Sequence, residues 1–237
     1  MKRLVLIIVR FIFELPGLLL KIKKYKKDKD AYPYEERFNF VRKILVKAAK
    51  RARVRVHITG RENLPKEGGY LLTPNHQGMF DIVMAFNAID RPFKIVYKQE
   101  LDSVKVLKDV LAFMEYYSID RTNLRQSMGV IRSAAKDLKA GYPMLIFPEG
   151  TRSRNGNQLL EFKGGTYKAA MNAKVPIVPA AFINSYEVLD SNSIKMVDVY
   201  LHIFEPITFE EYNGKKTEEI AKEVHDQIQD YINNQTH

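Results

Sequence analysis

Two residues of the chain are spaced in a way that suits proton transfer. His76 and Asp81 lie five positions apart in the segment NHQGMFD, residues 75–81. On a regular helix their side chains would point about 140° apart and could not pair. They can meet if His76 sits in a strand-to-helix turn and Asp81 in the first helical turn, where the carboxylate would orient one imidazole nitrogen and leave the other as a general base. The alternative is a surface or capping pair without a catalytic role.

Two further polar clusters each follow an apolar stretch, which is where α/β proteins usually keep their sites. In the segment FPEGTRSR, residues 147–154, Arg152 offers a guanidinium suited to phosphate and Glu149 can accept a hydrogen bond from a hydroxyl. The segment SIDR, residues 118–121, delivers Arg121. The alternatives are a solvated basic loop for the first cluster and a structural Asp120–Arg121 ion pair for the second.

Several classes of chemistry are missing from the sequence. It contains no Cys, which excludes a disulfide framework, cysteine-ligated zinc and a cysteine nucleophile. It also lacks the patterns HExxH, GxSxG, GxxxxGK[ST] and GxGxxG. These absences argue against a zinc site, a serine α/β-hydrolase, a P-loop nucleotidase and a Rossmann dehydrogenase, and we expect no metal.

The elements that would position these clusters alternate along the chain. Apolar runs predict strands at 54–58, 70–73, 93–97, 116–119, 144–147, 175–182 and 196–204. Helical patterns fall at 79–89, 101–114, 123–140, 164–173 and 215–233. The alternation predicts an α/β domain over residues 53–237, with a mixed, mostly parallel sheet flanked by helices.

A basic, apolar leader precedes this domain. The 237-residue chain has a net charge of +10, but residues 1–60 hold 17 Lys and Arg against 5 Asp and Glu, a balance of +12. The remaining 21 Lys and Arg against 23 Asp and Glu give −2. Such an asymmetry points to an anionic partner surface.

We interpret residues 1–52 as an amphipathic two-helix membrane anchor. In and beside residues 4–22 the polar positions, among them Arg3, Arg10 and Glu14, fall in one narrow helical stripe, and a second apolar stripe recurs from Phe38 to Ala52. We expect both apolar faces in the acyl boundary and the Lys and Arg side chains at anionic headgroups. This predicts a peripheral protein on the cytoplasmic face of the cell membrane. The main alternative is a single transmembrane helix over 4–22. A nucleic-acid-binding arm is a second alternative, but such arms are less apolar than this leader, so we expect no nucleic-acid partner.

The segments NHQGMFD, SIDR, FPEGTRSR and VPIVPAAF, in this order and spacing, resemble the four blocks of the glycerolipid acyltransferases. The likeness runs from about Val54 to Phe209 and is greatest to the bacterial 1-acylglycerol-3-phosphate acyltransferases. The stretch EFKGG, residues 161–165, also resembles a turn of that family. One departure is Gly78, which stands where the family usually has Ser.

The resemblance implies transfer of a fatty acyl group from acyl-CoA or acyl carrier protein to lysophosphatidic acid, giving phosphatidic acid, with no bound cofactor. His76 would deprotonate the acceptor hydroxyl and Asp81 would orient His76. The residues implied to bind the acceptor are Lys98, Arg121, Glu149, Gly150, Thr151 and Arg152, and those implied on the acyl-donor side are Val175, Pro176 and Pro179. The alternatives are another lysolipid acceptor, such as lyso-ornithine lipid, a hydrolase with a His76-activated water, and a lipid-binding module without activity.

Overall fold

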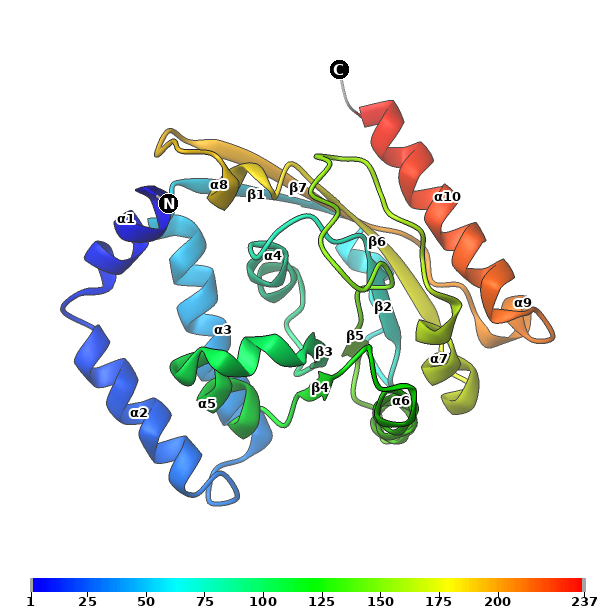
Figure 1. Cartoon of the computed structure of the whole chain (residues 1–237), viewed down its shortest axis with the longest axis horizontal. Helices are drawn as coiled ribbons and strands as arrows, with labels where there is room; N and C mark the ends of the chain where they lie inside the picture. Colours follow the sequence, from blue (N-terminus) through cyan, green and yellow to red (C-terminus); the bar gives the residue numbers. More distant parts are fainter. Residues whose placement is uncertain (1, 236–237) are drawn as a thin grey trace.

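A seven-stranded mixed sheet organises the chain in the computed structural model, which describes residues 2–235 (Figure 1). The strand order is β1-β7-β6-β2-β5-β3-β4. Strands β2 to β6 run parallel to one another, and β7 reverses against β6 and pairs with β1 in parallel. The strands are β1 Val54–Thr59, β2 Leu71–Pro74, β3 Lys94–Lys98, β4 Tyr117–Ile119, β5 Met144–Leu145, β6 Ile177–Ile183 and β7 Val197–Ile203.

Helices cover both faces of this sheet, which confirms the predicted fold class. The α-helices are α1 Lys2–Phe11, α2 Leu15–Lys27, α3 Tyr34–Arg51, α4 Asp81–Ala88, α5 Lys105–Phe113, α6 Leu124–Lys139, α7 Lys168–Ala173, α8 Glu187–Asp190, α9 Phe209–Tyr212 and α10 Thr217–Gln235. Three 3₁₀ turns are η1 Arg61–Asn63, η2 Gln99–Ser103 and η3 Gly164–Thr166. The predicted strand 144–147 is shorter in the structure. It pairs with β2 over Met144 and Leu145, the Ile146 amide still donates to the Leu72 carbonyl at 3.1 Å, and the chain then turns at Phe147, whose carbonyl accepts from the Gly150 amide at 3.1 Å.

Two apolar cores lie on opposite faces because successive strand residues point to opposite sides of the sheet. Leu72 and Leu145 pack with α3, α4 and α5, whereas their neighbours Leu71 and Met144 pack with α6, α7 and α10. The strands β2 and β6 are buried along their whole lengths. The parallel strands are therefore held rigidly at the centre, with their carboxyl ends at one edge.

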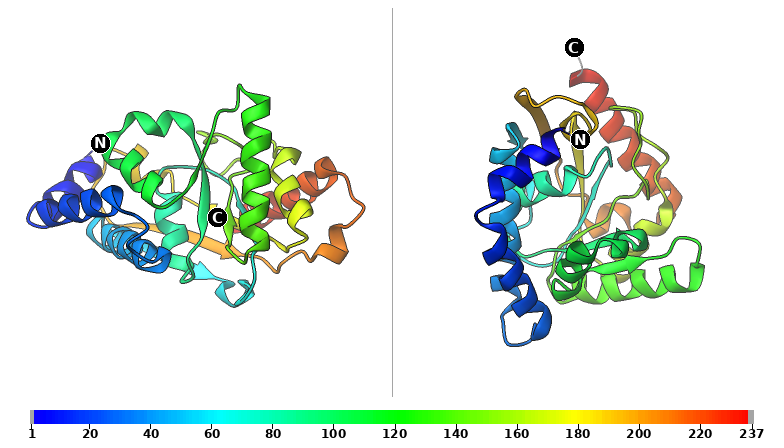
Figure 2. Two further views of the ribbon diagram at one scale, coloured as in Figure 1. Left: turned by 90° about the horizontal axis from the view of Figure 1, so that it is seen from below. Right: turned by 60° about the vertical axis from the view of Figure 1, so that its left-hand side comes forward.

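The N-terminal segment forms three helices, not the two that the sequence predicts. The chain turns between α1 and α2, where the Glu14 amide bonds to the Phe11 carbonyl at 2.8 Å. Pro16 has no amide hydrogen to donate within a helix, so it is accommodated in the first turn of a new one. Figure 2 shows α1 and α2 at one end of the molecule and α9 and α10 toward the other. Within residues 2–235, no helix combines the length and the apolar character that crossing a bilayer requires.

The prediction that the apolar face of residues 38–52 lies in the acyl boundary is wrong. Phe38 and Ala52 are fully buried in the protein, and Phe38 stacks on Phe86 of α4 with 5.2 Å between the ring centroids. Because α3 packs against α4 and β1, its apolar stripe belongs to the core of the α/β domain.

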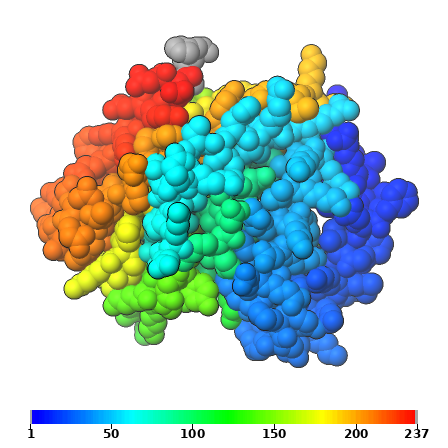
Figure 3. All heavy atoms as spheres, turned by 180° about the vertical axis from the view of Figure 1, so that it is seen from behind, coloured from blue at the N-terminus to red at the C-terminus, as the bar shows by residue number. Residues whose placement is uncertain are grey.

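Arg3 and Glu14, two members of the polar stripe of this segment, bond to the protein. Arg3 is buried and donates to the carbonyls of Ala52 at 2.6 Å and Lys195 at 2.8 Å. Glu14 bonds to Lys47 at 2.7 Å and also pairs with Arg51 on α3. The large apolar side chains left exposed on α1, α2 and the turn between them are Leu4, Val5, Ile8, Val9, Ile12, Phe13, Leu19 and Leu20. These helices, blue in Figure 3, form one flank of the molecule and expose apolar side chains there.

Candidate active site

The carboxyl ends of β2, β5, β3 and β4 bring the predicted clusters to one edge of the sheet. His76 follows β2, the loop containing Glu149 and Arg152 follows β5, Lys98 ends β3 and Arg121 follows β4. The four strands are parallel neighbours, so their ends lie side by side. The clusters recognised in the sequence therefore lie together at this edge.

His76 and Asp81 meet as the strand-to-helix turn predicts. Asp81 is the first residue of α4, and its Oδ2 lies 2.7 Å from Nδ1 of His76. The same oxygen accepts from the backbone amides of Gln77 at 2.8 Å and Gly78 at 3.1 Å. Because an ionised carboxylate only accepts hydrogen bonds, Nδ1 of His76 is the donor in this contact, and in the neutral imidazole the lone pair is then on Nε2.

The imidazole of His76 is also held across its face. The ring of Phe147 stacks on it with 3.9 Å between centroids and 19° between planes. The Asp81 side chain is fully buried, whereas that of His76 remains 19% exposed. The pair is therefore fixed from the protein side, while part of the imidazole remains exposed.

Glu149 ties two loops together. Its Oε1 accepts from the His76 amide at 2.6 Å and its Oε2 from the Leu160 amide at 3.0 Å. Burial raises the pKa of the Glu149 carboxyl to about 7, partly opposed by these two amides. The carboxylate thus joins the turn after β2 to the loop after β5, and both of its oxygens already have backbone partners.

Two cations converge on Gly150. This glycine has a φ of +74°, and a Cβ placed on it would lie 3.2 Å from Nζ of Lys163 and 3.5 Å from Nε of Arg121. Neither cation forms an ion pair within residues 2–235. Lys163 was not assigned a role from the sequence, although it lies in the stretch EFKGG; only its placement beside Arg121 marks it as part of the site.

The remaining predicted acceptor residues lie around this point. Thr151 is exposed and Arg152 half-buried in the loop after β5, and Arg152 has no carboxylate partner in the described part of the chain. Lys98 pairs with Glu100 at 2.7 Å. By strand register, Lys98 lies level with Ile119, two residues before Arg121.

Of the three predicted acyl-donor residues, Val175 and Pro176 lie away from His76, whereas Pro179 is level with a residue three positions before it. Pro179 pairs in register with Thr73, and Val175 and Pro176 come before β6 begins. Since β2 and β6 are parallel, Val175 lies roughly 20 Å back along the strand direction from His76, at about 3.3 Å per residue. Val175 and Pro176 therefore lie toward the opposite edge of the sheet.

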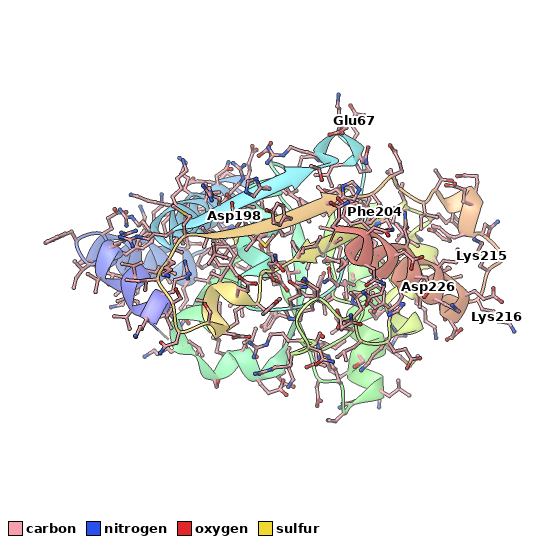
Figure 4. The ribbon with its side chains drawn as sticks, turned by 90° about the horizontal axis from the view of Figure 1, so that it is seen from above. Glu67, Asp198, Phe204, Lys215, Lys216 and Asp226 are labelled. Carbon is pink, nitrogen blue, oxygen red and sulfur yellow. The ribbon has the colours of Figure 1, made fainter. Side chains whose placement is uncertain are left out.

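A second histidine–aspartate pair shows why proximity alone does not define the site. His57 Nε2 lies 2.7 Å from Oδ1 of Asp198, labelled on β7 in Figure 4. Asp198 also makes two hydrogen bonds with Arg55, at 2.7 Å each, and these partners lower its pKa to about 2. The pair is exposed on β1 and β7, at the end of the sheet opposite β3 and β4. No group of three or more potential ligands among residues 2–235 is arranged to hold a metal ion.

Sequence comparison places these residues in a known family. The family model described as Acyltransferase matches residues 55–183. A protein of Mycoplasma pneumoniae named "Probable 1-acyl-sn-glycerol-3-phosphate acyltransferase" is 32% identical over 193 residues, covering 79% of this chain and 71% of that protein. The 1-acyl-sn-glycerol-3-phosphate acyltransferase of Borreliella burgdorferi is 28% identical over 179 residues, covering 75% of this chain and 71% of that protein.

The fold is also that of a solved acyltransferase. The crystal structure of the 1-acyl-sn-glycerophosphate acyltransferase PlsC from Thermotoga maritima superposes with a TM-score of 0.73 at 23% identity, covering 98% of this chain and 95% of that chain. The matched family segment contains the His76–Asp81 pair, Arg121 and the loop after β5. The chain therefore belongs to the acyltransferase family.

Proposed function

We propose that this acyltransferase moves a fatty acyl group from an acyl thioester, acyl-CoA or acyl carrier protein, to the free hydroxyl of 1-acyl-glycerol-3-phosphate, giving phosphatidic acid. The observation that carries the proposal is the His76–Asp81 pair, bonded through Nδ1, at the same sheet edge as Arg121 and Lys163, neither of which forms an ion pair among residues 2–235. Relatives named for this reaction support it.

In the proposed reaction, Nε2 of His76 takes the proton of the acceptor hydroxyl as its oxygen attacks the thioester carbonyl carbon. The C–O bond forms, the C–S bond breaks, and the proton passes from His76 to the departing thiolate. Asp81 stabilises the imidazolium that exists between these two transfers. No acyl group is attached to the protein, so the absence of Cys is no obstacle.

We assign the acceptor phosphate to the cations around Gly150. Arg121 and Lys163 approach this glycine from different elements, and Arg152 lies in the same loop. Guanidinium groups bind phosphate through paired hydrogen bonds, and an ammonium adds a point charge. Lys98 contributes less directly because Glu100 already pairs with it. Gly150 and Thr151 lie beside the acceptor, and we assign Glu149 to holding the two loops because its oxygens accept backbone amides.

We further propose that the exposed apolar side chains of α1, α2 and the turn between them lie in the acyl boundary of an anionic membrane surface. Arg3 and Glu14 attach this segment to the protein, so its apolar face points outward. Phe13 is 99% exposed, which is unfavourable in water but not in lipid. Both lysophosphatidic acid and phosphatidic acid are amphiphiles that reside at such a surface.

An acceptor panel tests the proposal. Purified protein on anionic liposomes receives each thioester carrier with lysophosphatidic acid, with a lysophospholipid bearing a larger headgroup, with lyso-ornithine lipid, or with no acceptor. We expect thiol release that depends on lysophosphatidic acid and equals the phosphatidic acid formed. Faster turnover of another lysolipid would replace the proposed acceptor, and thiol release without any acceptor would indicate a hydrolase.

A further inference from the structure

Asp81 receives hydrogen bonds on both carboxylate oxygens, from different parts of the chain. Its Oδ2 faces His76 and the amides of Gln77 and Gly78, all within its own turn. Its Oδ1 is bonded by Oγ of Ser185, which lies 104 positions away in sequence. Ser185 is 1% exposed, so this contact is made out of water.

The surroundings of Ser185 show which way its hydroxyl points. Oγ lies near two acceptors, Oδ1 of Asp81 and, at 3.1 Å, Oε1 of Gln77. Gln77 Oε1 already accepts from the Ser185 amide at 3.0 Å, while its Nε2 donates to Asn157 at 2.7 Å. The single hydroxyl proton therefore goes to the charged acceptor, where the hydrogen bond is stronger.

Ser185 is held in place by its position just after β6. It lies two residues beyond β6, after Asn184, whose φ of +62° turns the chain toward α8. Asn75 joins the end of β6 to the turn before His76, since its side chain bonds to the Phe182 amide at 2.7 Å and carbonyl at 3.0 Å. The hydroxyl is thus fixed relative to the strand that carries His76.

We propose that Ser185 is a positioning residue for acyl transfer. By fixing Oδ1 of Asp81, its hydroxyl sets the rotation of the carboxylate, so that Oδ2 faces Nδ1 of His76 and Nε2 points to the acceptor. Ser185 touches neither substrate in this scheme. The inference rests on the proposed role of His76.

Three variants test this role. Ser185→Ala removes the donor, Ser185→Cys keeps a similar volume with a weak donor, and Ser185→Thr keeps the hydroxyl. We expect kcat to fall about tenfold in the Ala variant, as for loss of a hydrogen bond to a charged group, and by a smaller factor in the Cys variant. Both KM values stay unchanged, and Thr retains kcat within about threefold. Ser191→Ala, which removes a hydroxyl bonded to the Glu187 carbonyl in the same region, should keep full activity.

A spectroscopic measurement adds a readout that a purely structural role would not move. In protein labelled with ¹⁵N-histidine, the Nδ1 proton of His76 should resonate far downfield, and Ser185→Ala should shift it while the His57 signals stay in place. Wild-type kcat and an unmoved resonance in folded Ser185→Ala protein would overturn the inference, as would a Thr variant no better than Ala. Full activity of His76→Ala would instead overturn the proposed mechanism, so the two failures are distinct.

Discussion

Replacing Glu149 by Gln should change how the stability of this protein depends on pH. Burial raises the pKa of the Glu149 carboxyl to about 7 from its ordinary value of 4.5. The folded protein therefore binds this proton more tightly than the unfolded chain does. The stability linked to that proton is fully present below pH 4.5 and is lost as the pH rises to about 7.

The size of the effect follows from the shift. At about 1.4 kcal/mol per pKa unit, ionisation of Glu149 in the folded state lowers the free energy of unfolding by on the order of 3 kcal/mol. The side chain introduced by Glu149→Gln cannot ionise, so the variant lacks this loss. Its amide oxygen can accept from only one of the His76 and Leu160 amides, which costs about 1–3 kcal/mol at every pH.

Denaturant unfolding in mild detergent, followed from pH 4 to 8 for wild type and Glu149→Gln, measures the difference. The free energy of unfolding of wild type minus that of the variant should fall by about 3 kcal/mol between pH 4.5 and 7.5. Contributions of other groups, such as His202, whose pKa burial lowers, are common to both proteins and cancel. A difference that does not vary with pH would refute the reasoning.

Three further substitutions probe the phosphate group, the loop and the membrane face. Arg152→Ala should raise the acceptor KM about tenfold or more and leave the donor KM nearly unchanged; equal rises in both would remove its assigned role. Gly150→Ala places a Cβ against the Lys163 ammonium at a φ of +74°, whereas the Cβ of Gly68→Ala, at a similar φ of +68°, would meet no atom within 4 Å. In thermal unfolding, Gly150→Ala should therefore lose more stability than Gly68→Ala; equal losses would mean that the contact with Lys163 contributes nothing. Phe13→Asp should weaken co-sedimentation with anionic vesicles, whereas Tyr200→Asp on β7 should not; unchanged binding of the Phe13 variant would contradict the membrane face.

The sequence predicted the meeting of His76 and Asp81 because the geometry is local. Five residues across a strand-to-helix turn leave few ways for the two side chains to lie. Arg121 and the loop containing Arg152 were expected at the same site from the family resemblance. The structure places them there because the carboxyl ends of parallel strands share one edge of a sheet.

Other features depend on contacts between distant segments, which pattern alone does not encode. The apolar stripe of α3 has the same periodicity whether it faces lipid or α4, and only the packing of the folded chain determines which of the two it contacts. Arg3 and Glu14 of the polar stripe likewise turned out to bond to carbonyls and cations of the protein. Ser185 gave no signal in the sequence, because its partner Asp81 lies 104 positions away.

The most direct test of the central claim is the rate of phosphatidic acid formation by two purified single variants, His76→Ala and His57→Ala. Each removes one histidine that lies 2.7 Å from an aspartate. With lysophosphatidic acid, a thioester donor and anionic liposomes, His76→Ala should lose activity by a factor on the order of 10³ or more while staying folded and vesicle-bound, and His57→Ala should match wild type. Wild-type activity in the His76 variant would contradict the assignment of His76 as the base.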